Sequence, residues 1–265
     1  MMVNEEIPPV GPFSPRFSRR GALRSEWIYG SGYQGPSSDE IFEALIARQP
    51  VWAGMDVLEI GSGLGGDAVR MATRYGVNIR AVDASADMTQ LCLDRLAAEP
   101  VDGIRFETGD VCTMELAPES VDLVWTRDCL MYLSERDRER AWSRLLTALR
   151  SGGRVLVTDY CRGESPSSPA FEELHNSSGF HLVNQEAYAT MMRRVGFCDV
   201  TAEDRTEDLL ASEVEGRARL VNDRDGFLEQ FTSGEYDQLL KRWDTKIDLS
   251  VSHQLTWMVL TARKP

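Results

Sequence analysis

The sequence predicts an α/β fold in which helices cover both faces of a doubly wound, mostly parallel sheet. Short apolar segments alternate with amphipathic helical segments along most of the chain, and strands joined by helices run parallel. A glycine-rich loop, Gly61 to Gly66, follows the first of these apolar segments and opens a helix. The 265 residues are 42% hydrophobic, which is enough to bury one large core.

The N-terminal residues 1–36 are expected to form an arm or lid. Several prolines favour an extended conformation over residues 1–25, and the aromatic and glycine residues from Trp27 to Tyr33 favour a turn with anchoring side chains. Ser37 to Glu40 can then cap a helix that runs to about Gln49, because serine and aspartate side chains accept hydrogen bonds from the first N–H groups of a helix.

Residues 37–206 are expected to form the core of alternating strands and helices. The expected strands are 56–60, 78–82, 104–107, 121–125 and 153–158, with late strands at 199–201 and 255–262. The expected helices are 65–75, 85–98, 135–150 and 185–195. Residues 207–265 are expected to form a helical insertion over the sheet, from 207 to 246, followed by the final core strand.

Composition limits the partners and the compartment. The formal net charge of −13 argues against nucleic acid and anionic membranes as partners, because both would repel an acidic surface. The five scattered cysteines suit neither a disulfide framework nor a metal site, and they favour the cytoplasm. No segment resembles a transmembrane helix or a secretory signal. The sequence leaves the oligomeric state open.

The glycine loop contains Gly61 and Gly63, which can adopt positive φ angles and let the backbone approach a ligand. The same pattern also occurs in dinucleotide-binding enzymes, so the loop alone does not identify the ligand. Glu59 favours a different ligand, because a carboxylate two residues before the first glycine would repel the pyrophosphate of NAD. This carboxylate would suit the ammonium group of a methionine moiety, although it could also cap local N–H groups.

Two further carboxylates follow the second and third expected strands. Asp83 is placed where a carboxylate can accept hydrogen bonds from both ribose hydroxyls, although it could also be an ordinary helix N-cap. Asp110 is placed to bind an adenine amino group. Ala84, Met88 and Val111 are expected to supply contacts to the same ligand. The predicted nucleoside site therefore lies at one edge of the sheet.

These motifs, taken in their order along the chain, resemble those of class I S-adenosylmethionine-dependent methyltransferases. The segments that carry the resemblance are Val57 to Gly66, Val82-Asp83, Gly109-Asp110, Asp122 to Trp125 and Gly152 to Asp159. The resemblance implies a Rossmann-like methyltransferase sheet with S-adenosyl-L-methionine as the cofactor. It also adds Arg127, at the end of the fourth strand, to the expected cofactor site.

Other segments resemble the sequence motifs of phosphoethanolamine N-methyltransferases more closely. They are Thr126 to Leu130, Leu133-Ser134 and Val157 to Cys161. The segment Leu255 to Leu260 also resembles the sarcosine and dimethylglycine methyltransferases. This resemblance implies that Asp128, beside Arg127, orients the acceptor amine, with an ordinary surface ion pair as the alternative.

The resemblance further implies acceptor roles for several aromatic residues. Tyr160 would present a hydroxyl group or an aromatic face to the acceptor, unless it is a buried core tyrosine. Where the family has a catalytic histidine, this chain has Tyr132, and Phe17 replaces the family's partner tyrosine in the arm. The contact that these two family residues make cannot form in the same way here.

The family's phosphate ligands are also partly replaced. Ser178 and Phe180 stand at the positions of an arginine and a tyrosine, while Lys246 lies near the family's phosphate lysine. Lys246 could also be an ordinary solvated lysine. His181 is a neighbouring candidate, with a satisfied or exposed histidine as the alternative. We therefore expect phosphoethanolamine to be a poor acceptor compared with an unphosphorylated amine.

The arm could complete the acceptor site instead. Arg16 and Arg19 could hold a carboxylate by a planar fork of hydrogen bonds, unless the arm is a disordered basic tail. Tyr29 and Tyr33 would close the site if the arm folds over it. The sequence thus predicts methylation of a small amine, either an amino acid or an ethanolamine-like compound.

Three alternatives to this function remain. The chain could methylate an oxygen or sulfur atom of a small metabolite, because the same fold would position those nucleophiles equally well. It could be an NAD-dependent oxidoreductase, although Glu59 argues against that reading. It could also be a non-catalytic module that keeps only cofactor binding. The residues expected to act directly on the acceptor are Asp128, Tyr132 and Tyr160.

Overall fold

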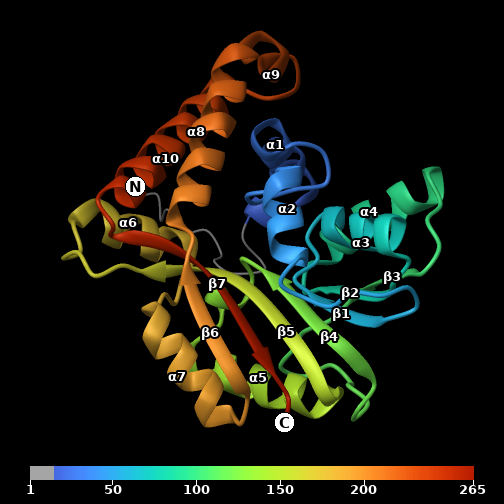
Figure 1. The fold of residues 1–265 in the computed structure, drawn as a ribbon. Helices are drawn as coiled ribbons and strands as arrows, with labels where there is room; N and C mark the ends of the chain where they lie inside the picture. Colours follow the sequence, from blue (N-terminus) through green and yellow to red (C-terminus); the bar gives the residue numbers. More distant parts are fainter. Residues whose placement is uncertain (1–14) are drawn as a thin grey trace, which may run out of the picture.

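The structure, a computed structural model, describes residues 15–265, and within them seven strands form one sheet (Figure 1). The strand order is β3-β2-β1-β4-β5-β7-β6. The first five strands in this order are parallel, and β7 is antiparallel to both of its neighbours. The predicted doubly wound, mostly parallel sheet is therefore confirmed. The strands are β1 Asp56–Ile60, β2 Asn78–Asp83, β3 Ile104–Thr108, β4 Val121–Arg127, β5 Leu149–Arg162, β6 Cys198–Asp204 and β7 Leu255–Arg263.

Helices cover both faces of the sheet, and each face has its own apolar core. One face packs on α2 and α3 through Phe42, Met71 and Trp125. The other packs on α5 and α7 through Trp142 and Tyr188. The helices are η2 Pro15–Phe17, α1 Arg19–Tyr29, α2 Asp39–Ile46, α3 Gly66–Tyr75, α4 Ala86–Ala98, η3 Leu130–Tyr132, α5 Glu135–Ala148, α6 Pro169–Ser178, α7 Gln185–Val195, α8 Thr206–Asn222, α9 Arg224–Gln230 and α10 Ser233–Val251.

The N-terminal arm is partly helical where we expected an extended segment, and the expected turn follows this helix at Ser31 and Gly32. From Arg19 to Tyr29 it forms the helix α1, which the side chain of Ser18 caps and Gly30, at φ 89°, ends. Ala22 and Ile28 are buried on one face of α1. Apolar burial therefore favours a helix up to Tyr29, and Gly30 and Gly32, at φ 89° and 87°, lie in the expected turn after it. The part of the predicted arm before Pro15 lies outside the described residues.

Two other regions add to the predicted pattern. The helix α6 was missed, although Ser168 caps it and Pro169 occupies its first turn, which together form a typical helix start. Residues 207–246 form most of α8 to α10, as expected for the helical insertion. Figure 1 shows α8 and α10 side by side, with α1 next to α8. Ile28, Tyr29 and Trp243 share an apolar cluster, which joins the arm to the insertion.

Candidate active site

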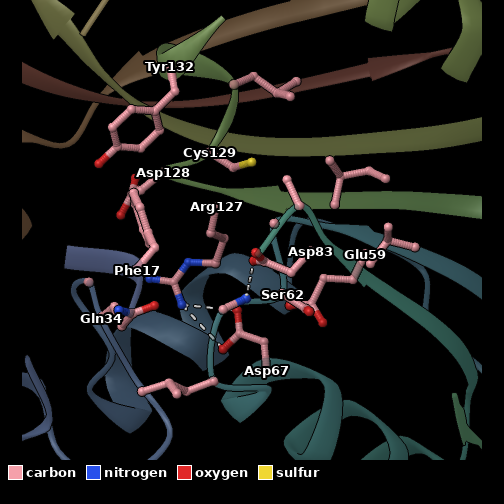
Figure 2. Close-up of a pocket in the computed structure, with 18 of the residues that line it drawn as sticks. Phe17, Gln34, Glu59, Ser62, Asp67, Asp83, Arg127, Asp128, Cys129 and Tyr132 are labelled. Carbon is pink, nitrogen blue, oxygen red and sulfur yellow. Dashed lines mark hydrogen bonds and ion pairs between the residues drawn. The ribbon is translucent and has the colours of Figure 1, made fainter. Parts of the chain in front are cut away.

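A cavity of about 320 Å³ opens at the carboxyl ends of β1, β2 and β4, under the arm (Figure 2). Loops that follow parallel strands meet at this edge, which is the usual place for a ligand in doubly wound folds. The volume is within the range of small-molecule sites. The wall is formed by Arg16, Phe17, Gly32 to Pro36, Glu59 to Leu64, Gly66, Asp67, Val82 to Ala84, Gly109 to Val111, Arg127 to Leu130, Tyr132 and Leu133.

The glycine loop bends sharply where β1 ends. Gly61 and Gly63 have φ angles of 74° and 52°. The N–H groups of Gly61 and Ser62 both donate to the carbonyl of Val82, at 2.8 and 3.1 Å. A Cβ atom at Gly61 would lie 2.3 Å from the Sγ atom of Cys129. The loop therefore needs glycine at position 61 both for its backbone angle and for its contact with β4.

Glu59 brings an unpaired carboxylate oxygen to the cavity wall. Its side chain is buried, and among the described residues its Oε2 atom has no hydrogen-bond partner. Burial, together with the charge of Asp67, raises the pKa of Glu59 well above its usual value. Buried polar atoms in proteins are nearly always paired, so this oxygen marks a position for a donor or cation from a ligand.

Asp83 and Asp110 lie at the same edge of the sheet. The Asp83 carboxylate accepts hydrogen bonds from the backbone N–H groups of Gly63 and Ser85, both at 2.8 Å. Burial raises the pKa of Asp83. The N-cap of α4 is Ser85, so the alternative that Asp83 is a helix N-cap is wrong. Asp110 lies at the exposed mouth and accepts a hydrogen bond from the backbone N–H of Cys112 at 2.8 Å.

Arg127 ties the loop before α2 to the start of α3. Its guanidinium forms an ion pair with Asp67 at 3.0 Å and donates to the carbonyl of Pro36. Trp125 donates to the same Asp67 carboxylate at 3.0 Å. The alternative of a surface ion pair between Arg127 and Asp128 is wrong, because the buried Arg127 pairs with Asp67 instead. Figure 2 shows Arg127 and Asp67 on one side of the cavity, with Asp83 and Glu59 nearby.

Asp128 is held by two strands. Its Oδ1 atom accepts hydrogen bonds from Trp257 Nε1 on β7 at 2.7 Å and from Thr158 Oγ1 on β5 at 3.0 Å. Its φ angle is 51°, in the left-handed region. Burial raises the pKa of Asp128, although the neighbouring Arg127 opposes that shift. A second carboxylate oxygen remains for a ligand, since Asp128 also lines the cavity.

Tyr132 and Phe17 meet across the cavity as two aromatic rings. Their ring centroids are 5.4 Å apart, with the planes at 85°. Arg16 donates to the hydroxyl of Tyr132 at 3.2 Å and to the carbonyl of Gln34 at 3.1 Å. The positions of the family's histidine and tyrosine are thus still in contact, by an edge-to-face pair. Arg19, which we expected to act together with Arg16, does not line the cavity. Its side chain is exposed and forms an ion pair with Asp94.

A second polar group lies behind this wall, and we call it the Lys246 cluster: Tyr29, Tyr160, Glu213 and Lys246. Lys246 forms an ion pair with Glu213 and donates to the hydroxyls of Tyr160 and Tyr29, at 2.9 and 3.1 Å. Tyr29 donates to Glu213 at 2.8 Å. Lys246 is only 3% exposed, so the alternative of a solvated lysine is wrong. Burial lowers the pKa of Lys246 to about 8, against the raising effect of Glu213.

Phe180 links the cavity to the Lys246 cluster. Its ring stacks on Tyr160 with centroids 5.9 Å apart and contacts Tyr132 at 5.4 Å. Tyr160 and Tyr29 are therefore one layer behind the cavity wall, and Tyr33 lies on the wall itself.

Besides Tyr29, Tyr160, Phe180 and Lys246, two further expected site residues do not line the cavity. Met88 is fully buried among Ala22, Leu64 and Leu91, because its helix turns it toward the arm. His181 is exposed, and it is held by its backbone, which donates to Met131 and accepts from Arg138. Neither side chain lines the cavity wall.

Sequence reasoning missed several residues that shape this site. Asp67, Trp257 and Glu213 contact predicted site residues from distant parts of the chain. Only Asp67 had a local signal, as an acidic residue in the first turn of the helix after the glycine loop. The other two are an aromatic residue in a strand and a glutamate in a charged helix, where such residues are common.

Residues 57–153 match the family described as "Methyltransferase domain". The chain carries a methyltransferase domain. This domain contributes Glu59, Asp83, Asp110, Arg127 and Asp128 to the cavity wall. The arm, which lies outside the matched residues, adds Arg16, Phe17 and Gly32 to Pro36 to this wall.

Similar proteins extend the comparison beyond the domain. The chain is 28% identical over 249 residues to phosphoethanolamine N-methyltransferase 1 of Triticum aestivum, which covers 94% of this chain and 49% of the relative. It is 26% identical over 253 residues to phosphoethanolamine N-methyltransferase of Plasmodium falciparum, with 94% and 93% covered. The chain spans about half the length of the plant relatives. The resemblance to this group is confirmed.

Solved structures agree with this comparison. Phosphoethanolamine N-methyltransferase 2 of Haemonchus contortus, in complex with phosphomonomethylethanolamine and S-adenosylhomocysteine, superposes with a TM-score of 0.91 and 29% identity. The match covers 95% of this chain and 58% of that one. A structure assigned to a sarcosine dimethylglycine methyltransferase of Galdieria sulphuraria shares the fold, with a TM-score of 0.75 at 17% identity, over 85% of this chain and 84% of that one.

Proposed function

We propose that this protein is an S-adenosylmethionine-dependent methyltransferase that methylates the nitrogen of a small amine. The observation that carries the proposal is the buried, unpaired Oε2 atom of Glu59 at the end of β1. A cationic amino group pairs with such an oxygen, whereas a pyrophosphate would be repelled by it. The similarity to phosphoethanolamine N-methyltransferases over most of the chain supports the same reaction class.

The described residues fit this cofactor. S-adenosylmethionine supplies a methyl group on a sulfonium, which is already an activated electrophile. Glu59 would hold the ammonium of its methionine part, with Arg127 ordering the adjoining loop. Asp83 would accept hydrogen bonds from the ribose, while Ala84, Asp110 and Val111 would surround the adenine at the mouth. The Gly61 and Gly63 backbone would lie against the ligand.

Asp128 and Tyr132 would form the binding site for the methyl acceptor. A methyl acceptor needs an exposed lone pair, correct alignment and little surrounding water. The free oxygen of Asp128 can accept a hydrogen bond from an amine and remove its proton, while Tyr132 lies across from Phe17 to restrict the space. We favour N-methylation over O- or S-methylation because of the similarity to phosphoethanolamine N-methyltransferases.

We place the reaction in the cytoplasm. All five cysteines are free thiols in the structure, which suits a reducing compartment. No helix among the described residues is both long and apolar enough to cross a membrane.

The function is tested by binding and by an acceptor screen. Calorimetry should give about one S-adenosylhomocysteine bound per chain and no binding of NAD. Labelled S-adenosylmethionine should then be incubated with phosphoethanolamine, ethanolamine, glycine, sarcosine and dimethylglycine, together with phenols and thiols, and the products identified by mass spectrometry. Binding of NAD without binding of S-adenosylhomocysteine would overturn the proposal. Cofactor binding without transfer to any acceptor would favour the non-catalytic module.

A further inference from the structure

Gly35, in the loop between α1 and α2, lies next to the carboxylate of Asp128 on the cavity wall. A Cβ atom added at Gly35 would lie 2.9 Å from the Oδ2 atom of Asp128, and both residues line the cavity. The φ angle of Gly35 lies outside the left-handed region, so the backbone itself does not require glycine at this position. The missing side chain therefore leaves space beside the carboxylate.

The protein fixes the direction of this carboxylate. Trp257 Nε1 and Thr158 Oγ1 both donate to Oδ1, and the backbone N–H of Asp128 donates to the carbonyl of Thr158 at 2.7 Å. Trp257 is fully buried on β7, so its indole cannot follow a carboxylate that moves. The Oδ2 atom could therefore turn away from Gly35 only if Oδ1 lost its two hydrogen bonds.

The space beside Oδ2 is the space that an amine would need. An amine nitrogen that donates to an oxygen lies about 2.7–3.2 Å from it, and a Cβ atom at position 35 would lie 2.9 Å from Oδ2. A side chain at this position would therefore crowd the amine and its substituents. A primary amine carries one carbon on its nitrogen, and each methyl group that is transferred adds another.

We propose that Gly35, beside a carboxylate oxygen that Trp257 holds in place, allows an amine that already carries methyl groups to bind at Asp128. Gly35 is a specificity-determining residue in this scheme, and Trp257 is a positioning residue that acts through Asp128. The inference rests on the proposed function for the methyl transfer, but binding of an amine at Oδ2 can be measured without turnover.

The first test uses acceptors that differ only in the methylation of their nitrogen. One such series is glycine, sarcosine and dimethylglycine, and another is phosphoethanolamine and phosphomonomethylethanolamine. In the series that the wild type uses, Gly35→Ala should lower kcat/KM for the methylated members at least about tenfold more than for the primary amine, because the added Cβ atom crowds the methyl groups. Gly234→Ala is the matched control, because a Cβ atom there meets nothing within 4 Å. An equal loss for all members, or a wild type that rejects the methylated amines, would overturn the proposal.

Calorimetry on the protein saturated with S-adenosylhomocysteine needs no turnover. Gly35→Ala should weaken binding of the most methylated amine of the series by roughly tenfold and leave binding of the primary amine nearly unchanged. If this difference appears but no acceptor is methylated, the proposed catalysis fails while the role of Gly35 stands. If no amine of either series binds the wild type, or if both amines lose affinity equally, the role of Gly35 is refuted.

Trp257→Phe tests the positioning of Asp128, because phenylalanine keeps an aromatic ring but cannot donate to Oδ1. We expect kcat to fall by roughly tenfold while affinity for S-adenosylhomocysteine changes little, since the carboxylate is no longer held toward the amine. Trp142→Phe is the matched control, because this buried tryptophan loses a hydrogen bond to Tyr188 on the other face of the sheet. The control should lower the melting temperature without lowering kcat.

An Asp128→Asn background separates positioning from a general loss of packing. In this background Trp257→Phe should lower kcat little further, because the carboxylate that Trp257 positions is already absent. An equal fall in both backgrounds would show that Trp257 is only structural. Thr158→Val removes the other donor to Oδ1 at a similar side-chain size, so it should also lower kcat, even if Trp257→Phe fails to fold. An unchanged kcat in Thr158→Val would contradict the positioning of Asp128 through Oδ1.

Discussion

Asp128 has one carboxylate oxygen occupied by the protein and one left for a ligand. Trp257 and Thr158, from two different strands, both bind Oδ1. An acceptor must be held in a fixed geometry, because a displacement of about 1 Å from the reactive position can lower the rate by about 100-fold. The residue was identified from its place after the fourth strand, whereas its supporting contacts were not.

For Asp128→Asn we expect kcat to fall by about 100-fold while affinity for S-adenosylhomocysteine changes little. An amide can keep the hydrogen bond from Trp257 but cannot take a proton from an amine. Steady-state kinetics and calorimetry on the same preparation measure the two effects. A parallel collapse of cofactor binding would assign Asp128 to the cofactor site or to folding.

Asp83→Ala tests the nucleoside side of the cavity. Loss of hydrogen bonds to a charged group should weaken binding of S-adenosylhomocysteine by about 1–3 kcal/mol. Asp102→Ala is a suitable control, because this aspartate is exposed and lies outside the cavity wall. Unchanged affinity in Asp83→Ala, measured by calorimetry, would remove Asp83 from the site.

At the scale of elements, the arm depends on a close contact between η2 and α1. A Cβ atom on Gly21 would lie 2.3 Å from the carbonyl oxygen of Pro15 and 2.6 Å from that of Arg16. The first turn of α1 therefore sets the position of η2, which carries Arg16 and Phe17 to the cavity. Buried Ala22 and Ile28 fix α1 in turn against the rest of the chain.

Gly21→Ala should consequently displace η2, raise KM for the acceptor and lower stability by about 1–3 kcal/mol, as overpacking does. Gly234→Ala is the matched control, because a Cβ atom there meets nothing within 4 Å. Alanine favours helix over glycine by about 1 kcal/mol, so this control should be neutral or slightly stabilised. Thermal unfolding and acceptor kinetics should separate the two variants, and equal behaviour would contradict a positioning role for Gly21.

At the scale of the whole molecule, Asp159 joins β5 to η3 and α7. It is fully buried and accepts hydrogen bonds from the Met131 N–H at 3.3 Å and from the Tyr188 hydroxyl at 3.1 Å. Burial raises the pKa of Asp159 to about 7, although the charge of Arg138 opposes this. The folded protein therefore keeps a proton that the unfolded chain releases near pH 4.

Between about pH 4 and 7 this group makes the free energy of unfolding decrease as pH rises, by up to about 1.4 kcal/mol per pH unit. The stabilisation is largest below the unfolded pKa and is lost as pH rises through the folded pKa. Asp159→Asn stays neutral throughout and should lose this contribution to the slope. Urea unfolding at pH 5, 6, 7 and 8 should show the difference between the two proteins change up to about pH 7 and then level off. Parallel curves would contradict the assignment.

The alternation of strands and helices, and the edge of the sheet where the cavity lies, could be predicted from the sequence. These follow from local signals: apolar periodicity, helix caps such as Ser85, and glycines such as Gly61 that adopt positive φ angles. Glu59, Asp83 and Asp128 were found because carboxyl ends of parallel strands meet at one edge whatever the rest of the chain does.

The distant side chains that complete the site could not be predicted, because packing of the folded chain brings them together. Gly35 lies beside Asp128, Trp257 binds Asp128 and Lys246 is buried with Glu213. None of these pairs has a sequence period or a local motif, because each partner comes from a separate element whose position depends on packing. The arm forms α1 for a related reason, because it packs against α8, while Gly30 and Gly32 end the helix with positive φ angles.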